Sequence, residues 1–320
     1  MALLLREADV ESLATMPEAV QWVEQSLRAH GAGRARVLPR QRVKLPTGTL
    51  HVLPAADQEL GVVGLKAYTS FREGARFLVL LYSAESGQLL ALVEADLLGM
   101  LRTGAASGVA TRYMARQDAD VLAVFGSGWQ ARGQVEAVAA VRPLRQVRVY
   151  SRDAERRRRF AAEMSQRVGV EVVASASPEA ALEGARVVCT ITTARDPLFA
   201  SDAVQDGTHI NAAGSNSLIR RELDEKLVRR ARVIAVDSRA QAPLESGDLL
   251  VPAERGWIDW ALLPELSEIV SGRTPGRLAD QDVTIFESHG IGLEDVAMAA
   301  HLYERARAAG VGEDVAIFTA

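Results

Sequence analysis

The middle of the chain alternates between short apolar runs and longer amphipathic segments. Runs rich in Val and Ile predict β-strands at residues 121–125, 146–150, 171–174, 186–190, 209–213, 233–237 and 283–287. Segments of helical period between them predict helices at residues 153–167, 178–184, 221–230 and 260–271. Several of the strands lack polar alternation, so both of their faces should be covered. Alternating strands and helices predict an α/β fold, a doubly wound Rossmann-type parallel sheet over residues 117–292.

The first 116 residues follow a different pattern. Residues 16–30 predict an amphipathic helix with Val20, Val23 and Leu27 on its apolar side. Short strand-like runs broken by Pro and Gly follow, with a hairpin-like Ser-Ala-Glu-Ser-Gly at 83–87, and then a helix at 103–115. A last predicted helix, 293–309, comes after the final sheet strand, and we expect it to return and pack on this N-terminal region. This part of the chain is therefore an α+β region outside the parallel sheet.

Composition narrows the class of protein. The formal net charge of −4 argues against nucleic acid or an anionic membrane as the main partner. Cys189 is the single cysteine, which excludes a disulfide framework and fits a reducing compartment. The histidines lack the spacing of metal ligands, so we predict no metal site. The first residues lack the features of a signal peptide, and no apolar run is long enough to span a membrane. We expect a cytoplasmic protein.

The first predicted strand runs into a glycine-containing loop. Residues 121–131 read VLAVFGSGWQA, a G-x-G-x-x-A pattern in which Ala131 stands where the dinucleotide fingerprint has its third glycine. The loop follows the first strand and opens the first helix, as a phosphate-binding loop does. The alternative is a tight turn without a ligand. The candidate cofactor contacts in this loop are Gly126, Ser127, Gly128, Trp129, Gln130 and Ala131.

The end of the second strand indicates which dinucleotide is bound. In NAD-binding proteins an acid near this point binds the ribose hydroxyls. Here the strand ends with Tyr150, Ser151 and Arg152, and the first carboxylate, Asp153, belongs to the next helix. A hydroxyl and a guanidinium suit the 2′-phosphate of NADPH. The sequence therefore predicts NADPH in preference to NADH.

Three cationic residues in the N-terminal region stand in apolar surroundings: Arg42, Lys66 and Arg102. Only three of the 37 basic residues are lysine, so Lys66 is a mild indication that an ammonium group is required there. A charge in such surroundings is costly unless it is paired, and the carboxylate of a small substrate would pair with it. Arg102 and Thr103 would also stand at a helix N-terminus, which favours anions. Alternatively, each cation pairs with an Asp or Glu of the fold.

Five segments together resemble the ornithine cyclodeaminase/mu-crystallin family. They read LRTGAASGVATRYMAR, GSGWQA, INAAGSNSLIRRELDE, VDSRAQAPLESGDL and SHGIGLEDVAMAAHLYERAR, and the resemblance covers nearly the whole chain. It implies a homodimer in which residues 1–116 plus 293–320 form a substrate-binding and dimerisation domain. The dinucleotide-binding domain, residues 117–292, would be inserted within it.

The resemblance also assigns site residues. Arg42, Lys66 and Arg102 match the positions that bind the substrate carboxylate. Ser288 and His289 lie in a loop similar to the one lining the nicotinamide. The cofactor contacts that it implies are Thr103, Gly126, Ser127, Gly128, Gln130, Ala131, Ser151, Arg152 and Thr192.

One position departs from the family's cyclodeaminases. Those enzymes carry an aspartate acid/base two residues after the glycine of N-A-x-G, where this chain has Asn216. An amide cannot take up a proton. We therefore predict an oxidoreductase that reduces the C=N bond of a small 2-imino acid (ketimine) to an L-amino acid with NADPH. Lys66 or His289 would deliver the proton.

Other functions stay open at this point. They are an alanine dehydrogenase-like amino-acid dehydrogenase, an ornithine cyclodeaminase, and a non-catalytic NADPH-dependent ligand-binding protein. A hydroxyacid dehydrogenase would need a histidine paired with a carboxylate, here His289 with Glu287 or Glu294. A second acidic group on the substrate would need a further cation, and Arg72 or Arg76 could serve.

Overall fold

The computed structural model describes residues 1–317, and the chain divides into two compact units. The terminal unit comprises Met1–Arg102 and the segment from Ile291 onward, and the central unit comprises Thr103–Gly290. The sequence places the boundary at residue 116, whereas the division falls inside helix α3 (Asp96–Met114). A Cβ at Gly104 would collide with the backbone of Gly133, so the second half of α3 packs closely on α4.

The central unit contains a parallel sheet of seven strands in the described chain, in the order β10-β9-β8-β11-β12-β14-β13. This is the arrangement of a doubly wound dinucleotide-binding fold, with the first strand β8 near the middle. The predicted α/β class is therefore confirmed. The strands are β8 (Val121–Phe125), β9 (Gln146–Tyr150), β10 (Glu171–Ala174), β11 (Val187–Thr190), β12 (His209–Ala212), β13 (Val233–Val236) and β14 (Thr284–Glu287).

Successive residues of β8 enter two separate hydrophobic cores. Val121, Ala123 and Phe125 belong to one core, and Leu122 and Val124 belong to the other. Alternate residues of a strand point to opposite faces of its sheet, so both faces are covered. Because both faces are buried, the sequence of this strand shows no alternation of apolar and polar residues.

Helices of the central unit follow most of the predicted segments. The predicted helix 260–271 divides into η2 and α10, because Pro264 lies between them and lacks the N–H that a continuous helix needs. Helix α7 begins at Glu225 because the Asp224 side chain accepts a hydrogen bond from the Lys226 N–H and caps it. The described helices are α4 (Trp129–Val141), α5 (Ala154–Val168), α6 (Pro178–Leu182), α7 (Glu225–Arg230), α8 (Ala242–Glu245), α9 (Gly247–Glu254) and α10 (Leu266–Val270), with 3-10 helices η1 (Ser201–Ala203) and η2 (Trp260–Leu262).

The terminal unit is built on a mixed, largely antiparallel sheet. Its strand order is β15-β1-β7-β6-β5-β4-β2, with β3 paired to β4. The predicted hairpin at 83–87 joins β6 to β7. The strands are β1 (Ala2–Leu5), β2 (Ala35–Val37), β3 (Gln41–Leu45), β4 (Gly48–Asp57), β5 (Val62–Phe71), β6 (Gly74–Ser83), β7 (Leu89–Glu94) and β15 (Glu313–Val315).

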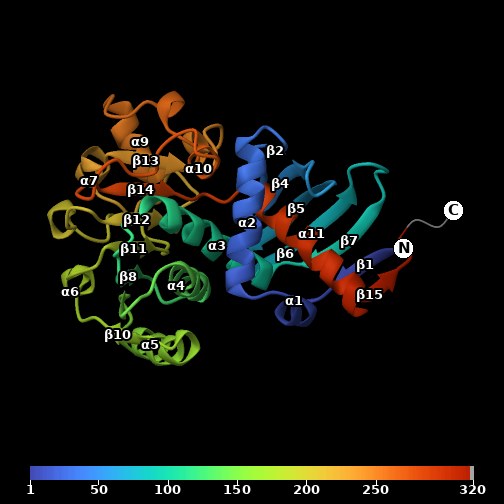
Figure 1. Ribbon diagram of the computed structural model, residues 1–320, viewed down its shortest axis with the longest axis horizontal. Helices are drawn as coiled ribbons and strands as arrows, with labels where there is room; N and C mark the ends of the chain where they lie inside the picture. The colour runs from blue at the N-terminus through green and yellow to red at the C-terminus, as the bar shows by residue number, and fades with distance from the viewer. Residues whose placement is uncertain (318–320) are drawn as a thin grey trace. The chain divides into compact units, whose positions relative to one another are not determined.

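Helices α2 (Met16–Gly31) and α11 (Gly292–Ala309) cover one face of this sheet, with the short α1 (Glu7–Leu13) at its end (Figure 1). Helix α11 crosses β4, β5 and β6. A Cβ at Gly64 of β5 would lie 3.2 Å from Val296 Cγ2 of α11. Glycine at this position lets the helix lie close to the strand, which brings the side chains of its first turn onto the sheet.

Helix α3 begins seven residues before the predicted start. It runs from Asp96, and the Asp96 and Leu97 N–H groups donate to the Glu7 carboxylate. Arg102 and Thr103 therefore lie in the middle of a helix, so the prediction that they stand at a helix N-terminus is wrong. Residues 97–101 are apolar and extend the helix toward its N-terminus, and Glu7 binds the N–H groups of residues 96 and 97.

Within residues 1–317, none of the helices is both long and apolar enough to cross a bilayer.

Candidate functional site

The terminal unit places two of the predicted cations beside two acids of helix α11. Lys66, on β5, is 2 % exposed, and its Nζ lies 2.8 Å from Asp295 Oδ1. Arg102 lies 2.9 Å from Glu294 Oε2 through its Nη1 and 3.3 Å from Asp295 Oδ1 through its Nε. Lys66 and Arg102 thus share the carboxylate of Asp295. The ion pairs join residues that are about 200 positions apart in the sequence.

The surroundings of Lys66 are shaped to accept its ammonium group. A Cβ at Gly99 of α3 would lie 3.1 Å from Lys66 Nζ, so the glycine leaves room for the group. The Phe77 ring lies 5.1 Å from the same nitrogen, at a distance suited to a cation–π contact. Burial and the positive charges of Arg102 and Arg40 outweigh Asp295 and lower the pKa of Lys66 to about 8.

Lys66 and Arg102 therefore realise the alternative that the sequence left open, in which the cations pair with acids of the fold. These pairs leave binding capacity. An ammonium has three N–H donors and a guanidinium has five, and each pair uses only some of them. The geometry keeps two buried cations side by side with donors available for a further anion.

Arg42 lies on the same face of the sheet as Lys66. It is in register with His51 of β4, and His51 is in register with Tyr68 of β5, two residues from Lys66. His51 stacks on Tyr68 with 4.1 Å between the ring centroids. Burial and the charges of Arg42 and Arg40 lower the pKa of His51 to about 4, so it adds no positive charge at neutral pH.

Arg40 is a further cation of this group, and the sequence pattern does not single it out. It is buried, with 6 % of its surface exposed, and it contributes to the positive potential at Lys66 and at His51. Its spacing from Arg42 could have identified it, because residues two apart on an extended chain share a face and Arg40 precedes Arg42 by two.

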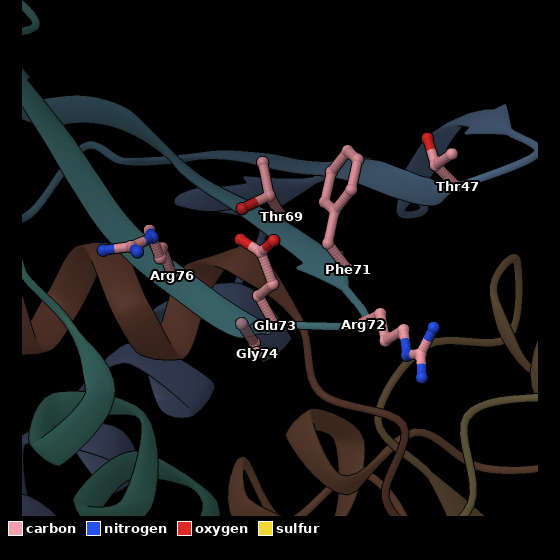
Figure 2. A pocket seen from close by; sticks show the side chains of 8 residues that line it. Thr47, Thr69, Phe71, Arg72, Glu73, Gly74 and Arg76 are labelled. Atoms are coloured by element: carbon pink, nitrogen blue, oxygen red, sulfur yellow. The ribbon is translucent and has the colours of Figure 1, made fainter.

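Arg72 and Arg76, the candidates for a second substrate acid, line an open pocket at the tip of the β5–β6 hairpin (Figure 2). Arg76 is in register with Thr69, which is three residues from Lys66 on β5. An odd separation places Thr69 and Arg76 on the face opposite Lys66. Arg76 is therefore not part of the cation group around Lys66 in the same chain.

In the central unit the loop after β8 has the geometry of a dinucleotide cradle. Gly126 has a φ of 125°, and a Cβ there would lie 2.5 Å from the Ile191 carbonyl oxygen, so only glycine fits. At Gly128 a Cβ would meet nothing within 4 Å. Among residues 1–317, no side chain caps the N-terminus of α4, which starts at Trp129. Open backbone N–H groups at a helix start suit a pyrophosphate, so these residues fit a dinucleotide.

The end of β9 carries hydroxyl and cationic groups. Ser151 Oγ lies 2.9 Å from Ser127 Oγ, which joins this strand end to the glycine loop. The Asp153 carboxylate accepts the N–H groups of residues 155 and 156 and caps α5, so it is engaged in the fold. The Arg157 guanidinium lies 5.1 Å from the Tyr150 ring and donates to the Ser151 carbonyl, while Arg152 is exposed.

The remaining cofactor candidates come from the same edge of the sheet or from α3. Thr192 follows β11, and Ser288 follows β14 and donates from its N–H to the Ala212 carbonyl. Asn216, a predicted catalytic residue, follows β12. Carboxyl ends of parallel strands share one edge, so these residues lie at the edge of the sheet that also carries the glycine loop. Thr103 lies on α3, and its carbonyl accepts from Gln134 of α4.

His289 is buried between two acids of the central unit. Its Nδ1 lies 3.4 Å from Asp237 Oδ1 and its Nε2 lies 3.5 Å from Glu287 Oε2. Asp237 also accepts the N–H groups of His289 and Gly290. Hydrogen bonds and charge from the two acids outweigh burial and raise the pKa of His289 to about 10. With both nitrogens facing carboxylates, this imidazolium is suited to holding the loop rather than to exchanging protons at neutral pH.

Comparison with known proteins identifies the family. Residues 1–310 match the model of the ornithine cyclodeaminase/mu-crystallin family. A Delta(1)-pyrroline-2-carboxylate reductase of Bacillus cereus is 34 % identical, over 98 % of this chain and 99 % of the relative. The Thermococcus litoralis enzyme of the same name, solved with NADH and L-proline, superposes with a TM-score of 0.93 at 34 % identity, covering 98 % of this chain and 100 % of that one. An archaeal alanine dehydrogenase dimer with bound NAD superposes with a TM-score of 0.92 at 32 % sequence identity, and the match covers 99 % of both chains. The chain belongs to the ornithine cyclodeaminase/mu-crystallin family.

Proposed function

We propose that the protein reduces the C=N bond of a small 2-imino acid to an L-amino acid with a nicotinamide cofactor. The observation that carries the proposal is the buried pair of cations, Lys66 and Arg102, with N–H donors beyond those used by Asp295 and Glu294. A carboxylate is the anion that every 2-imino acid carries, and charge-assisted hydrogen bonds would hold it there.

The chain's own residues would mainly position the substrate. Lys66 and Arg102, with Arg42 on the same face of the sheet, would bind the carboxylate and fix the direction in which the C=N carbon points. The glycine loop 126–131 and the N-terminus of α4 would hold the dinucleotide phosphates. The cofactor supplies a hydride. Because a protonated imine is already electron-poor, correct placement contributes most of the rate.

Asn216 favours reduction over cyclodeamination. Cyclodeaminases of the family, by the resemblance described above, use an aspartate at this position, and an amide cannot replace it as an acid/base. The pyrroline-2-carboxylate reductases that resemble this chain act on a cyclic 2-imino acid. A cyclic ketimine is therefore the substrate class that we propose first.

We assign proton delivery to Lys66 rather than to His289. The lowered pKa of Lys66, about 8, allows its ammonium to donate near neutral pH. His289, with a pKa of about 10 and two carboxylate partners, would retain its proton. His289 and Ser288 would instead shape the loop that follows β14.

We propose NADPH as the preferred cofactor. The end of β9 presents the Ser151 hydroxyl and the exposed Arg152, and the first carboxylate after the strand, Asp153, is engaged in capping α5. A 2′-phosphate would meet donors and no competing anion among these residues. The solved relatives hold NADH or NAD, so titration with both cofactors decides the preference.

We also propose a homodimer in the cytoplasm. The face of the terminal sheet opposite α11 carries exposed apolar side chains, among them Val43, Leu50, Val63 and Phe71. Such a surface is typical of an interface between subunits. The archaeal alanine dehydrogenase relative is a dimer. Light scattering on the purified protein would give twice the chain mass, and a monomer would contradict the proposal.

A steady-state assay tests the function. NADPH oxidation should proceed with pyrroline-2-carboxylate, faster than with pyruvate plus ammonia, and ornithine should release no ammonia. Faster turnover of pyruvate with ammonia would assign the protein to the alanine dehydrogenases, the second candidate, which a 32 % identical solved relative favours. Ammonia release from ornithine without net cofactor turnover would contradict our interpretation of Asn216.

A further inference from the structure

Glu222 is a buried acid that binds two loops at the carboxyl edge of the central sheet. Its side chain is completely buried in the segment between β12 and α7. Oε1 accepts hydrogen bonds from the Thr192 backbone N–H at 2.6 Å and from the Thr192 hydroxyl at 2.7 Å. Oε2 accepts the Gly214 N–H at 3.0 Å. One carboxylate thus joins the loop after β11 to the loop after β12, with one oxygen for each.

Gly214 is required for this arrangement. A Cβ at position 214 would collide with the Glu222 carboxylate and with the Thr192 N–H. The absence of a side chain lets both loops approach the acid. The contact is therefore built from three residues of two loops, and Thr192 and Gly214 contribute backbone N–H groups to it.

The loop that Glu222 holds touches the dinucleotide cradle. Ile191, immediately before Thr192, donates from its N–H to the Phe125 carbonyl at 2.9 Å. The Ile191 carbonyl oxygen is the atom 2.5 Å from the Cβ position of Gly126. A shift of Thr192 would therefore move the backbone against which the glycine loop rests.

The backbone of Glu222 is hydrogen-bonded to helix α9. Asp248, in the first turn of α9, accepts the N–H groups of Glu222 at 2.7 Å and Leu223 at 2.6 Å through one oxygen, Oδ1. The Glu222 carbonyl accepts the Leu198 N–H at 2.9 Å. These hydrogen bonds fix the backbone of Glu222. Its carboxylate, held in place in this way, fixes the backbone of Thr192 and Gly214 in the two loops.

We propose that Glu222 is a positioning residue of the dinucleotide site, which sets cofactor affinity by fixing the loops after β11 and β12. The assignment of this edge to the cofactor rests on the proposed function. Glu222 binds no substrate or cofactor atom in this account, and it acts through Thr192 and Gly214.

The test is the dissociation constant of NADPH and of NADH, measured by fluorescence titration of the full chain and its E222Q variant. An amide has one acceptor oxygen, so in E222Q an NH₂ group must face the N–H of Thr192 or of Gly214. A buried donor facing another donor is costly, and we expect the dissociation constant to rise about tenfold. At saturating cofactor, the KM for the imino acid should change less than twofold.

Two control variants separate positioning from the loss of a buried charge. D248N removes an acid from the same cluster, but the amide oxygen can still accept both N–H groups, so a smaller rise than in E222Q is expected. E136Q changes a largely buried acid of α4 whose partner is Arg167, and cofactor affinity should stay at the wild-type value. Melting temperatures of all variants would be recorded, and the titrations run well below them.

Two results would overturn the proposal: wild-type cofactor affinity in E222Q, or an equal rise in E222Q and D248N. If E222Q fails to fold, E222D replaces it, because it keeps both oxygens but is one methylene too short to reach both loops, and the same rise is expected. The titration does not depend on imine reduction. A wild-type protein that binds NADPH but reduces no imino acid would refute the proposed function, and the comparison of variants would still decide the role of Glu222.

Discussion

Lys66 and Asp295 form a buried ion pair of 2.8 Å between strand β5 and the first turn of helix α11. Arg102 shares the same carboxylate oxygen at 3.3 Å. The pair holds a cation in a place where it would otherwise be too costly to bury, and it leaves part of the ammonium free to bind an anion. The same contact thus contributes to the fold and to the proposed substrate site.

The first prediction concerns catalysis. Lys66→Met should lower kcat/KM for the imino acid about 100-fold, because a charge-assisted contact to the carboxylate and to the transition state is lost. The dissociation constant of NADPH should not change. Lys226→Met, which removes an exposed lysine from α7, is the matched control and should leave both values unaltered. An unchanged kcat/KM in Lys66→Met would exclude Lys66 from the site.

The second prediction concerns stability. Asp295→Asn should reduce the free energy of unfolding by about 3 kcal/mol, because Lys66 loses its partner while still buried. The double variant Lys66→Met with Asp295→Asn should be more stable than Asp295→Asn alone, since no unpaired ammonium remains. Urea denaturation of the four proteins completes the cycle. Additive losses would show that the two residues do not interact.

The third prediction is a pH dependence of activity. The pKa of Lys66 is lowered from 10.5 to about 8, so kcat/KM should fall as the pH rises through 8 and the ammonium loses its proton. Stability should change in the opposite sense. Between pH 8 and 10.5 the unfolded chain binds the proton more strongly, so the unfolding free energy contributed by Lys66 rises with pH. Lys66→Arg, whose charge persists at these pH values, should lack the descending limb of activity.

The fourth prediction concerns cofactor choice. Arg152→Ala should raise the dissociation constant of NADPH about tenfold and leave that of NADH unchanged, because only the former carries the 2′-phosphate. Arg159→Ala, an exposed arginine on the following helix, serves as the control. Equal effects on the two cofactors would remove Arg152 from phosphate recognition.

The fifth prediction concerns the acid cluster around Glu222. Burial outweighs its hydrogen bonds and raises the pKa of Glu222 from 4.5 to about 7. The stability linked to this group is fully present below pH 4.5 and is lost as the pH rises through 7, at a cost of roughly 3 kcal/mol. The melting temperature of the wild type should therefore fall between pH 5 and pH 8 more than that of E222Q. Burial and the charges of Glu287 and Glu222 raise the pKa of Asp248, so E222Q also changes the titration of Asp248. The same comparison between D248N and the double variant E222Q/D248N removes that contribution, and the difference between the two melting temperatures should persist there.

The parallel sheet could be predicted almost residue by residue from the chain. Its strands are covered on both faces, so runs such as 121–125 are apolar throughout and their limits are visible. The glycine loop was equally visible, because its backbone geometry at Gly126 admits no other residue. Helix limits depend on contacts that a local pattern does not contain: α3 begins where Glu7, 89 residues away in the sequence, binds the Asp96 N–H, and the predicted helix 260–271 is interrupted at Pro264, which lacks an N–H.

The pairing of the site residues was decided by the tertiary structure. The sequence by itself determined that Lys66 and Arg102 are cations in apolar surroundings, and that Asn216 replaces an acid. It did not determine that Asp295 lies between the two cations, that Asp237 and Glu287 enclose His289, or that Glu222 joins two loops. Hydrophobic periodicity is a local property and can be read along the chain. A buried charge pair depends on which distant segments the fold brings within about 3 Å, and no local pattern records that distance.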